Sequence, residues 1–143
     1  MSDADIGQVT EWMSNPAKMF DVAGQTAIVT GASGAFGRGI AITLAAQGAN
    51  ILLASGNEGE LKSVQKDCEG VGGKATYLVR RPDSLEDAEA MRDAALDNFG
   101  SIKMLAIGSG YNKAGFIQDL EYQDWQDVMD ANVRGAWFMA KAV

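Results

Sequence analysis

Short apolar runs alternate with segments of helical periodicity from residue 25 to the end of the chain. The runs lie at residues 25–30, 50–55, 74–80 and 103–109. Runs of this length and character are typical of buried strands. Between them apolar residues recur at steps of three or four, as Phe36, Ile40 and Leu44 do, and this spacing indicates helices.

Capping residues and glycines indicate where these helices begin and end. Asn57 with Glu60, and Ser84 with Asp87, have the spacing of residues that cap a helix at its N-terminus. Gly48 stands where the first helix is expected to stop. The sequence therefore predicts helices near 35–48, 57–69, 84–100 and 125–143.

Strand and helix alternate four times, which predicts an α/β fold with a parallel sheet covered by helices on both faces. Right-handed crossovers leave few topologies, and a doubly wound, Rossmann-like sheet is the first among them. We expect residues 21–143 to form one domain that ends after the fourth strand and the fourth helix. Residues 1–20 are expected to be an N-terminal extension, either a short amphipathic helix carrying Ile6, Val9 and Met13 or a loosely packed segment.

Composition excludes several kinds of chemistry. The 143 residues carry a formal net charge of −7, which argues against a broad basic surface for nucleic acid or an anionic membrane. With no histidine and one cysteine, the chain has no histidine base, internal disulfide or cysteine–histidine zinc site, and no metal site is predicted.

The N-terminus lacks the features of a signal peptide, and no run approaches the ~18 apolar residues of a membrane-spanning helix. The expected location is therefore the cytoplasm.

A glycine-rich turn, TGASGAFGRG at residues 30–39, lies between the first strand and the first helix. Gly31 is placed to take a left-handed conformation, and Gly34 and Gly37 allow backbone or ligand to approach closely. The amides that open the helix near Ser33 lack partners within it and lie at the positive end of its dipole, so they are expected to bind an anion such as a pyrophosphate. The alternative is a turn that binds no ligand. A P-loop is excluded, because no Gly-Lys-Ser/Thr follows at the required spacing.

These motifs resemble those of the short-chain dehydrogenase/reductase family, whose T-G-x-x-x-G-x-G turn overlays Thr30, Gly31, Ala35 and Gly37, with alanine in place of the middle glycine. The alternative family spacing, T-G-x-x-G-x-x-G, fits with Gly34 and needs no substitution. The likeness extends from about Phe20 to Val143. It implies a dinucleotide-binding (Rossmann) domain over residues 21–143, incomplete at its C-terminus. It also implies an NAD(P)-dependent oxidoreductase that transfers hydride between nicotinamide and a carbonyl or alcohol substrate. Phe36 overlays a family position that abuts the nicotinamide, or else it is a helix-packing residue.

The adenosine side of the expected site departs from the family pattern. Ser55 ends the second strand where members that prefer NAD carry an acidic residue, and Gly56 stands where members that prefer NADP carry arginine. Serine would not repel a 2′-phosphate, so the sequence favours NADP over NAD as cofactor, unless Ser55 merely ends the strand. Arg81 overlays an adenine-contacting Asp of the family, with Asp83 available in a shifted register. We hypothesise that Arg80 or Arg81 contacts the 2′-phosphate; a solvated pair beside a turn is the alternative.

The fourth strand and the expected catalytic residues also differ from the family pattern. The family's Asn-Asn-Ala-Gly motif overlays residues 107–110, where only Gly110 persists as a cofactor-binding residue, so backbone groups there need other partners. The Tyr-x-x-x-Lys pair of the family's proton transfer does not occur, because Tyr77, Tyr111 and Tyr122 have no lysine four residues on. By resemblance Asn132 is an auxiliary catalytic residue that helps hold a water. Alternatively, it is a hydrogen-bonded polar residue of its helix.

Two functions are compatible with these features. The first is the cofactor-binding part of an oxidoreductase whose remaining portion would hold the catalytic pair and act on a small-molecule substrate, so that the chain alone is inactive. The second is a noncatalytic nucleotide-binding or interaction module, as in a pseudoenzyme or a gene fragment. We also expect a homo-oligomer that associates through the apolar residues of the fourth helix, such as Trp125 and Met139.

Overall fold

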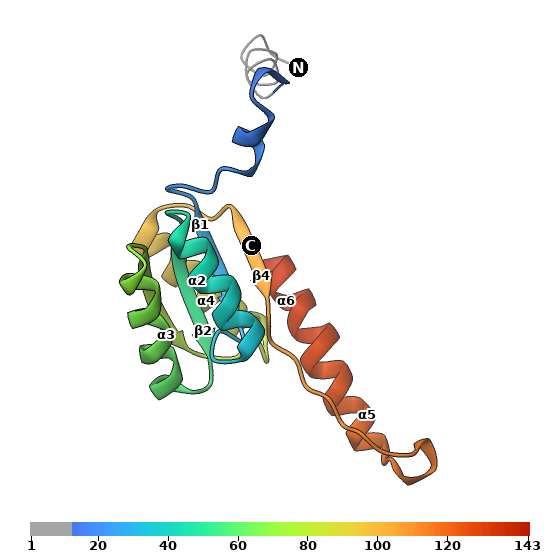
Figure 1. Cartoon of the computed structure of the whole chain (residues 1–143). Coiled ribbons are helices and arrows are strands. Elements are labelled where there is room, and N and C mark those ends of the chain that lie inside the picture. The colour runs from blue at the N-terminus through green and yellow to red at the C-terminus, as the bar shows by residue number, and fades with distance from the viewer. Residues whose placement is uncertain (1–12) are drawn as a thin grey trace.

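Four parallel strands and the helices that join them form a Rossmann-like α/β fold, as the sequence predicts (Figure 1). The structure, a computed structural model, describes residues 13–143. The strand order is β3-β2-β1-β4, with β1 at Thr26–Thr30, β2 at Asn50–Ser55, β3 at Lys74–Val79 and β4 at Met104–Ile107. The helices are η1 (Pro16–Phe20), α2 (Ala35–Ala46), α3 (Glu58–Gly70), α4 (Leu85–Phe99), η2 (Ile117–Asp119), α5 (Tyr122–Met129), the π-helical η3 (Asp130–Arg134) and α6 (Gly135–Ala142).

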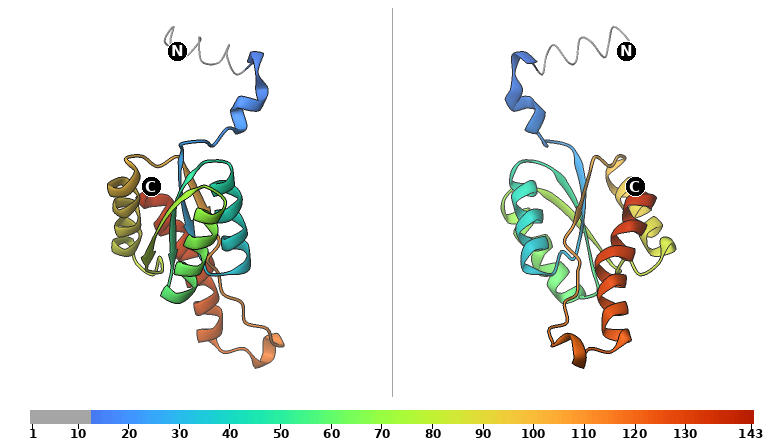
Figure 2. Two further views of the ribbon diagram at one scale, coloured as in Figure 1. Left: turned by 60° about the vertical axis from the view of Figure 1, so that its left-hand side comes forward. Right: turned by 90° about the vertical axis from the view of Figure 1, so that its right-hand side faces the viewer.

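Helices cover both faces of the sheet, and strand residues alternate between two hydrophobic cores (Figure 2). Val29 and Leu53 pack with α2 and α3 on one face, whereas Ile28 and Leu52 pack with α4 and α6 on the other. All of β1 is buried, because it lies between β2 and β4. A strand in this position has no solvent-facing side, which explains why its central residues Ala27, Ile28 and Val29 are all apolar.

The buried face of α2 is not the apolar stripe that indicated this helix. Gly37, Ala41 and Ala45 are buried, whereas Phe36 is 85% exposed and Ile40 is 37% exposed. Small residues let a helix approach the sheet closely, and the larger residues of the neighbouring stripe then remain outside. Leu44, the third residue of the stripe, is partly buried against the core. The spacing therefore identified the helix correctly but its buried face only in part.

Hydrogen bonds at the starts of α3 and α4 agree with the predicted caps. Asn57 Oδ1 accepts from Glu60 N at 3.2 Å, and Ser84 Oγ accepts from Asp87 N at 3.1 Å. α4 ends at Gly100, whose φ of 77° lies in the left-handed region. The two N-caps fix where the loops after β2 and β3 end and the helices begin.

The predicted fourth helix is continuous in its path but changes its winding in the middle. Between α5 and α6 the chain forms the π-helical segment η3. Here Gly135 N donates to Asp130 O, across a turn wider than that of an α-helix. Asn132 Nδ2 donates to Val128 O at 2.8 Å and so competes with the backbone for a helix carbonyl. The structure confirms a helix here, and its change of winding was not predicted, because the side-chain bond has no signature in the apolar spacing.

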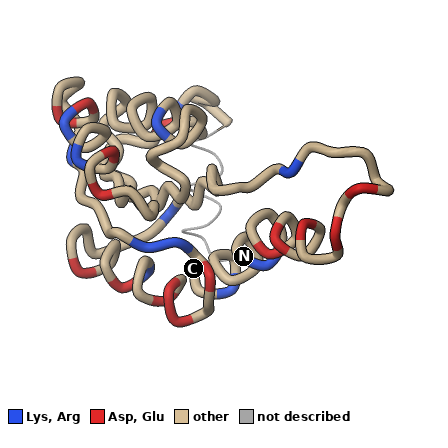
Figure 3. Tube along the Cα trace, turned by 90° about the horizontal axis from the view of Figure 1, so that it is seen from below, with Lys and Arg blue, Asp and Glu red and all other residues tan. Residues whose placement is uncertain are grey.

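α5 projects from the body of the molecule, at the end opposite the N-terminal segment (Figure 1). It has no buried residue. Acidic residues outnumber basic ones along this helix and the loop before it (Figure 3). Tyr122 and Trp125 are 73% and 53% exposed, and their rings stack at 5.7 Å between centroids. The projecting helix therefore presents both apolar and acidic side chains to its surroundings.

The part of the N-terminal segment that the structure describes lies outside both cores. The 3₁₀-helix η1 has no buried residue, and Phe20 is 81% exposed. Ile6 and Val9, which suggested an amphipathic helix, lie outside the described residues. Across residues 13–143, no helix is both long enough and apolar enough to cross a membrane.

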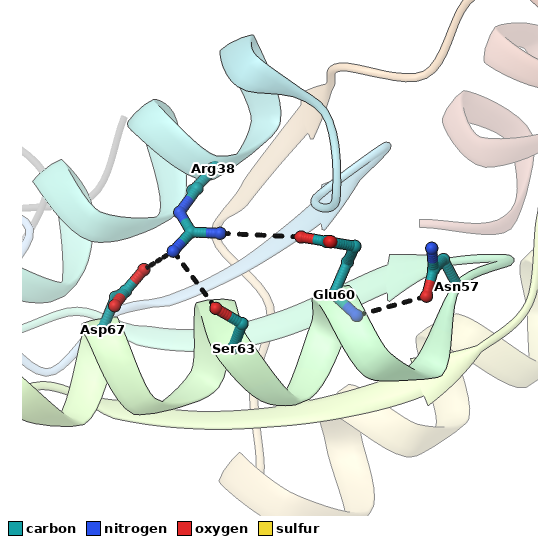
Figure 4. Close-up of polar contacts among 5 residues, drawn as sticks. All are labelled: Arg38, Asn57, Glu60, Ser63 and Asp67. Atoms are coloured by element: carbon teal, nitrogen blue, oxygen red, sulfur yellow. Dashed lines mark hydrogen bonds and ion pairs between the residues drawn. The ribbon is translucent and has the colours of Figure 1, made fainter.

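Arg38, the basic residue of the glycine turn, is directed to α3 (Figure 4). Its guanidinium forms an ion pair with Asp67, donates to Ser63 Oγ at 3.2 Å and lies 3.7 Å from Glu60 Oε2. These contacts fasten α2 to α3. The guanidinium of Arg38 therefore already has its ion-pair and hydrogen-bond partners within the protein.

Cys68 is buried on the inner face of α3, and we expect its thiol to be unreactive in the folded chain. Burial, with the neighbouring charges of Asp67 and Glu69, raises the pKa of this thiol to about 11. At pH 8 roughly one thiol in a thousand is then ionised. A maleimide dye should label the native chain far more slowly than the chain in denaturant. Equal labelling rates in the two conditions would show that Cys68 is accessible.

Candidate functional site

The carboxyl ends of the four strands open into a cavity of about 530 Å³. Each strand contributes the loop that follows it, and the helix formed by α5, η3 and α6 lines the remaining side. The lining residues are Gly31, Ser33 and Gly34; 54–57; 80–83; 108–111; and Asp127, Asp130, Ala131, Arg134 and Gly135. β1 lies between β2 on one side and β4 on the other, so the order in which strands are added to the sheet reverses at β1. Ligands of doubly wound folds bind at such a switch point.

Three residues of the glycine turn, Gly31, Ser33 and Gly34, line this cavity. Gly31 has a φ of 61°, the left-handed conformation that the sequence predicts, and its carbonyl accepts from Gly34 N at 2.9 Å. Among the described residues, the first amide of α2 with an acceptor is that of Arg38, which donates to Gly34 O at 2.9 Å. The amides of the preceding turn can therefore bind an anion, with the helix dipole adding to the attraction.

Three glycines meet behind the turn and leave no space for a side chain. A Cβ atom on Gly31 would overlap the carbonyl of Gly108. A Cβ atom on Gly37 would lie 2.7 Å from the carbonyl carbon of Gly31, and one on Gly108 would lie 2.9 Å from Thr30 O. This close packing places the start of α2 directly against the ends of β1 and β4, as a backbone cradle for a phosphate requires.

The end of β4 finds partners in place of the asparagines that the family motif has there. Gly108 N donates to Thr30 O at 3.1 Å, and the hydroxyls of Thr30 and Ser109 lie 3.0 Å apart in a hydrogen bond. These contacts join the end of β4 to the end of β1. The bond from Gly108 N satisfies two backbone groups, and the bond between Thr30 and Ser109 joins two side chains.

Comparison with known proteins agrees with this geometry. A family model described as short chain dehydrogenase matches residues 25–143. The chain belongs to the short-chain dehydrogenase family. An uncharacterised oxidoreductase of Mycobacterium tuberculosis is 40% identical to it over 124 residues, which cover 86% of this chain and 45% of the relative.

Solved structures of short-chain dehydrogenases share the fold. A short-chain type dehydrogenase/reductase from Mycobacterium marinum matches with a TM-score of 0.84 at 28% identity, covering 88% of this chain and 51% of that chain. An actinorhodin polyketide ketoreductase, solved with NADPH, matches with a TM-score of 0.79 at 25% identity, covering 82% of this chain and 45% of that chain. The chain spans about half the length of the curated relatives that it matches.

Most residues that the sequence suggested for a short-chain dehydrogenase cofactor site lie together. Those that line the cavity are Gly31, Ser33, Gly34, Ser55, Arg81 and Gly110. Gly37 lies behind the turn, where it packs against Gly31. Phe36 does not line this cavity; its exposed ring borders a shallow hollow on the outer face of α2. Asp83, the alternative to Arg81 at the adenine position, also lines the cavity.

Asn132 holds the loop after β4 against the π-helical segment. Its Nδ2 atom donates to Tyr111 O at 2.7 Å as well as to Val128 O. A Cβ atom on Gly110 would lie 2.7 Å from Asn132 Oδ1, so glycine permits this close approach. Both amide hydrogens are therefore used within the protein, and the role that the structure supports directly is positioning of the loop.

Sequence reasoning missed the contribution of the last helix to the cavity. Asp130 and Arg134 face the loops after β3 and β4, and they form an ion pair at 3.0 Å. Gly135 is buried against Pro82, whose carbonyl oxygen would lie 3.1 Å from a Cβ atom at position 135. The glycine within an otherwise helical run was the available signal for this close contact.

Proposed function

We propose that this chain binds a nicotinamide dinucleotide as the cofactor-binding part of a short-chain dehydrogenase. The observation that carries the proposal is the glycine turn at the cavity, whose first-turn amides lack internal acceptors. Family membership supports it, as does the structural neighbour that was solved with NADPH. In this proposal the amides at the start of α2 bind the pyrophosphate, and the loops after β2 and β3 surround the adenosine.

The chemistry proposed for the whole protein is hydride transfer to or from a carbonyl or alcohol substrate, which is what a bound nicotinamide supplies. This chain would bind and orient the cofactor. Asn132 and Gly110 would hold the loop after β4 in place. The family's Tyr-x-x-x-Lys pair does not occur in these 143 residues, so we propose that the catalytic proton transfer requires residues outside them. We expect the chain alone to bind cofactor without turning over substrate.

A noncatalytic nucleotide-binding module is the second candidate function. The observation that favours it is the same absence of the Tyr-x-x-x-Lys pair from this sequence. The coding sequence after the codon for Val143 separates the two candidates. A serine followed by Tyr-x-x-x-Lys supports the enzyme, and a stop codon supports the module.

Substitution of Gly34 tests the proposed pyrophosphate site with little change to the turn. A Cβ atom at position 34 would lie 3.3 Å from Gly31 O, so the turn must shift by a few tenths of an ångström. Gly34 is the N-cap of α2 and has an extended backbone (φ −83°, ψ 162°), which aspartate and asparagine both adopt readily at an N-cap. Gly34→Asp places a carboxylate beside the phosphates, so we expect NADPH and NADH to bind about 10-fold more weakly or worse. Binding is measured by titration of the cofactor's fluorescence.

Gly34→Asn is the matched control, because it has the same size and capping ability without the charge. We expect it to bind cofactor more tightly than Gly34→Asp, and the two variants to melt at similar temperatures, since both place the same Cβ atom against Gly31 O. Equal cofactor binding by the native chain and Gly34→Asp would contradict a phosphate at this helix start.

A further inference from the structure

The end of β2 offers no negative charge to a ligand in the cavity. Ser55 is buried and its hydroxyl accepts from Asn57 N at 3.2 Å. Gly56 has no side chain. The next carboxylate along the chain, Glu58, lies 2.8 Å from Lys62 Nζ and accepts from the Tyr77 hydroxyl. In dinucleotide-binding folds an acidic residue near this point binds the ribose 2′-hydroxyl, and it would repel a phosphate there.

Arg81 fills the space above Gly56. A Cβ atom at position 56 would lie 2.8 Å from Arg81 Nε and 3.4 Å from Arg81 Nη2. The guanidinium therefore reaches from the loop after β3 to the place where a side chain following β2 would stand. Both residues line the cavity, so the positive charge at this end of the cavity comes from the neighbouring strand.

The other two arginines of the cavity are already paired. Arg80 Nη1 lies 2.6 Å from Asp87 Oδ1, and Arg134 Nη2 lies 3.0 Å from Asp130 Oδ2. The hydrogen bond from the Ser84 hydroxyl, followed by that from Arg80, holds the pKa of the Asp87 carboxyl below its ordinary value. Arg81 has no ion pair or hydrogen bond to the rest of the chain within residues 13–143. Its five donors remain available to a ligand.

We propose that Arg81 binds the 2′-phosphate of NADP and makes this chain selective for NADP over NAD. This inference rests on the proposed dinucleotide site, because it takes the adenosine ribose to lie over Ser55 and Gly56. A planar guanidinium forms paired hydrogen bonds with a phosphate, and no carboxylate on the β2 side opposes them. The selectivity for NADP over NAD would therefore come from Arg81, which follows β3 rather than β2. Its guanidinium occupies the space left open because residue 56 is glycine.

Calorimetric titration of the full 143-residue chain with NADPH and with NADH tests this role. We expect the native chain to bind NADPH about 10- to 100-fold more tightly than NADH, the range of a charged hydrogen-bonded pair. Arg81→Ala should remove this preference and leave NADH affinity within about twofold, since NADH lacks the phosphate. Arg80→Ala is the matched control and should keep the preference.

A second variant tests the geometry. Adding Gly56→Arg to Arg81→Ala puts a guanidinium back into the same space from β2, and it should restore at least part of the preference for NADPH. If Arg81→Ala keeps the native preference, or the native chain binds NADH as tightly as NADPH, the role of Arg81 is refuted while the dinucleotide site stands. Failure of the native chain to bind either nucleotide would refute both. Circular dichroism of each variant verifies that it is folded.

Discussion

Gly37→Ala is expected to lower the free energy of unfolding by about 3 kcal/mol, the upper range for an overpacked site. The added methyl group would overlap the Gly31 carbonyl and lie 2.9 Å from Ala32 Cα. These atoms belong to the backbone of the turn and cannot move aside as a flexible side chain could. α2 would have to shift away from the sheet to remove this overlap, and the shift would also displace the amides at its start. Chemical denaturation measures the loss, and a cofactor titration should show weakened binding.

Gly39→Ala is the matched control, two residues further along the same helix. A Cβ atom at position 39 has nothing within 4 Å. Alanine favours the helix over glycine, so this variant should gain about 0.5–1 kcal/mol. Equal stability of the Gly37→Ala and Gly39→Ala chains would contradict the close packing of Gly31, Gly37 and Gly108.

Met139→Ala is expected to lower the free energy of unfolding by about 3 kcal/mol. Met139 is fully buried and packs in the core that α4 and α6 form against the sheet, together with Ile28 and Met91. The expectation that Met139 takes part in association was therefore wrong, because the core of the monomer encloses its side chain. Truncation leaves a cavity at the point where the last helix meets the sheet. The expected loss is measured by chemical denaturation at low protein concentration, where the monomer dominates.

Trp137→Ala is the control on the opposite face of α6. Trp137 is 56% exposed and its ring contacts Phe138 and Lys141. We expect the monomer's stability to change by less than about 1 kcal/mol, as for most surface substitutions.

We propose that the exposed face of α6 that carries Trp137, with Trp125 on α5, mediates association of the chain. Sedimentation should show the native chain self-associating and Trp137→Ala doing so less; a native chain that stays monomeric at high concentration would contradict this association.

Element order and the starts of α2, α3 and α4 could be predicted from the sequence because local signals determine them. The last helix begins at Tyr122, three residues before its predicted start. The buried runs of β1 and β2, the caps at Asn57 and Ser84, and the left-handed glycine at Gly31 each follow from residues close in the chain. The strand boundaries differ from those predicted by a few residues at most. The longest difference is at β4, which ends at Ile107 where the chain turns toward Ser109.

What the sequence did not predict depends on contacts between distant segments. Gly108 was noted only as a departure from the family motif, yet it packs against Gly31 from the other side of the fold. Arg80 and Arg81 could not be told apart in the sequence. In the structure Asp87, placed by the cap of α4, pairs with Arg80, while Gly56 opens a space for Arg81.

We propose above all that the amides at the start of α2 bind the pyrophosphate of a nicotinamide dinucleotide. Amide chemical shifts of the nitrogen-15-labelled chain, recorded during titration with NADPH, test it most directly. The predicted result is that the largest shifts occur at residues 33–37, with further shifts after β2 and β3. Saturable binding that leaves residues 33–37 unchanged, or the absence of any shift at millimolar NADPH, would contradict the claim.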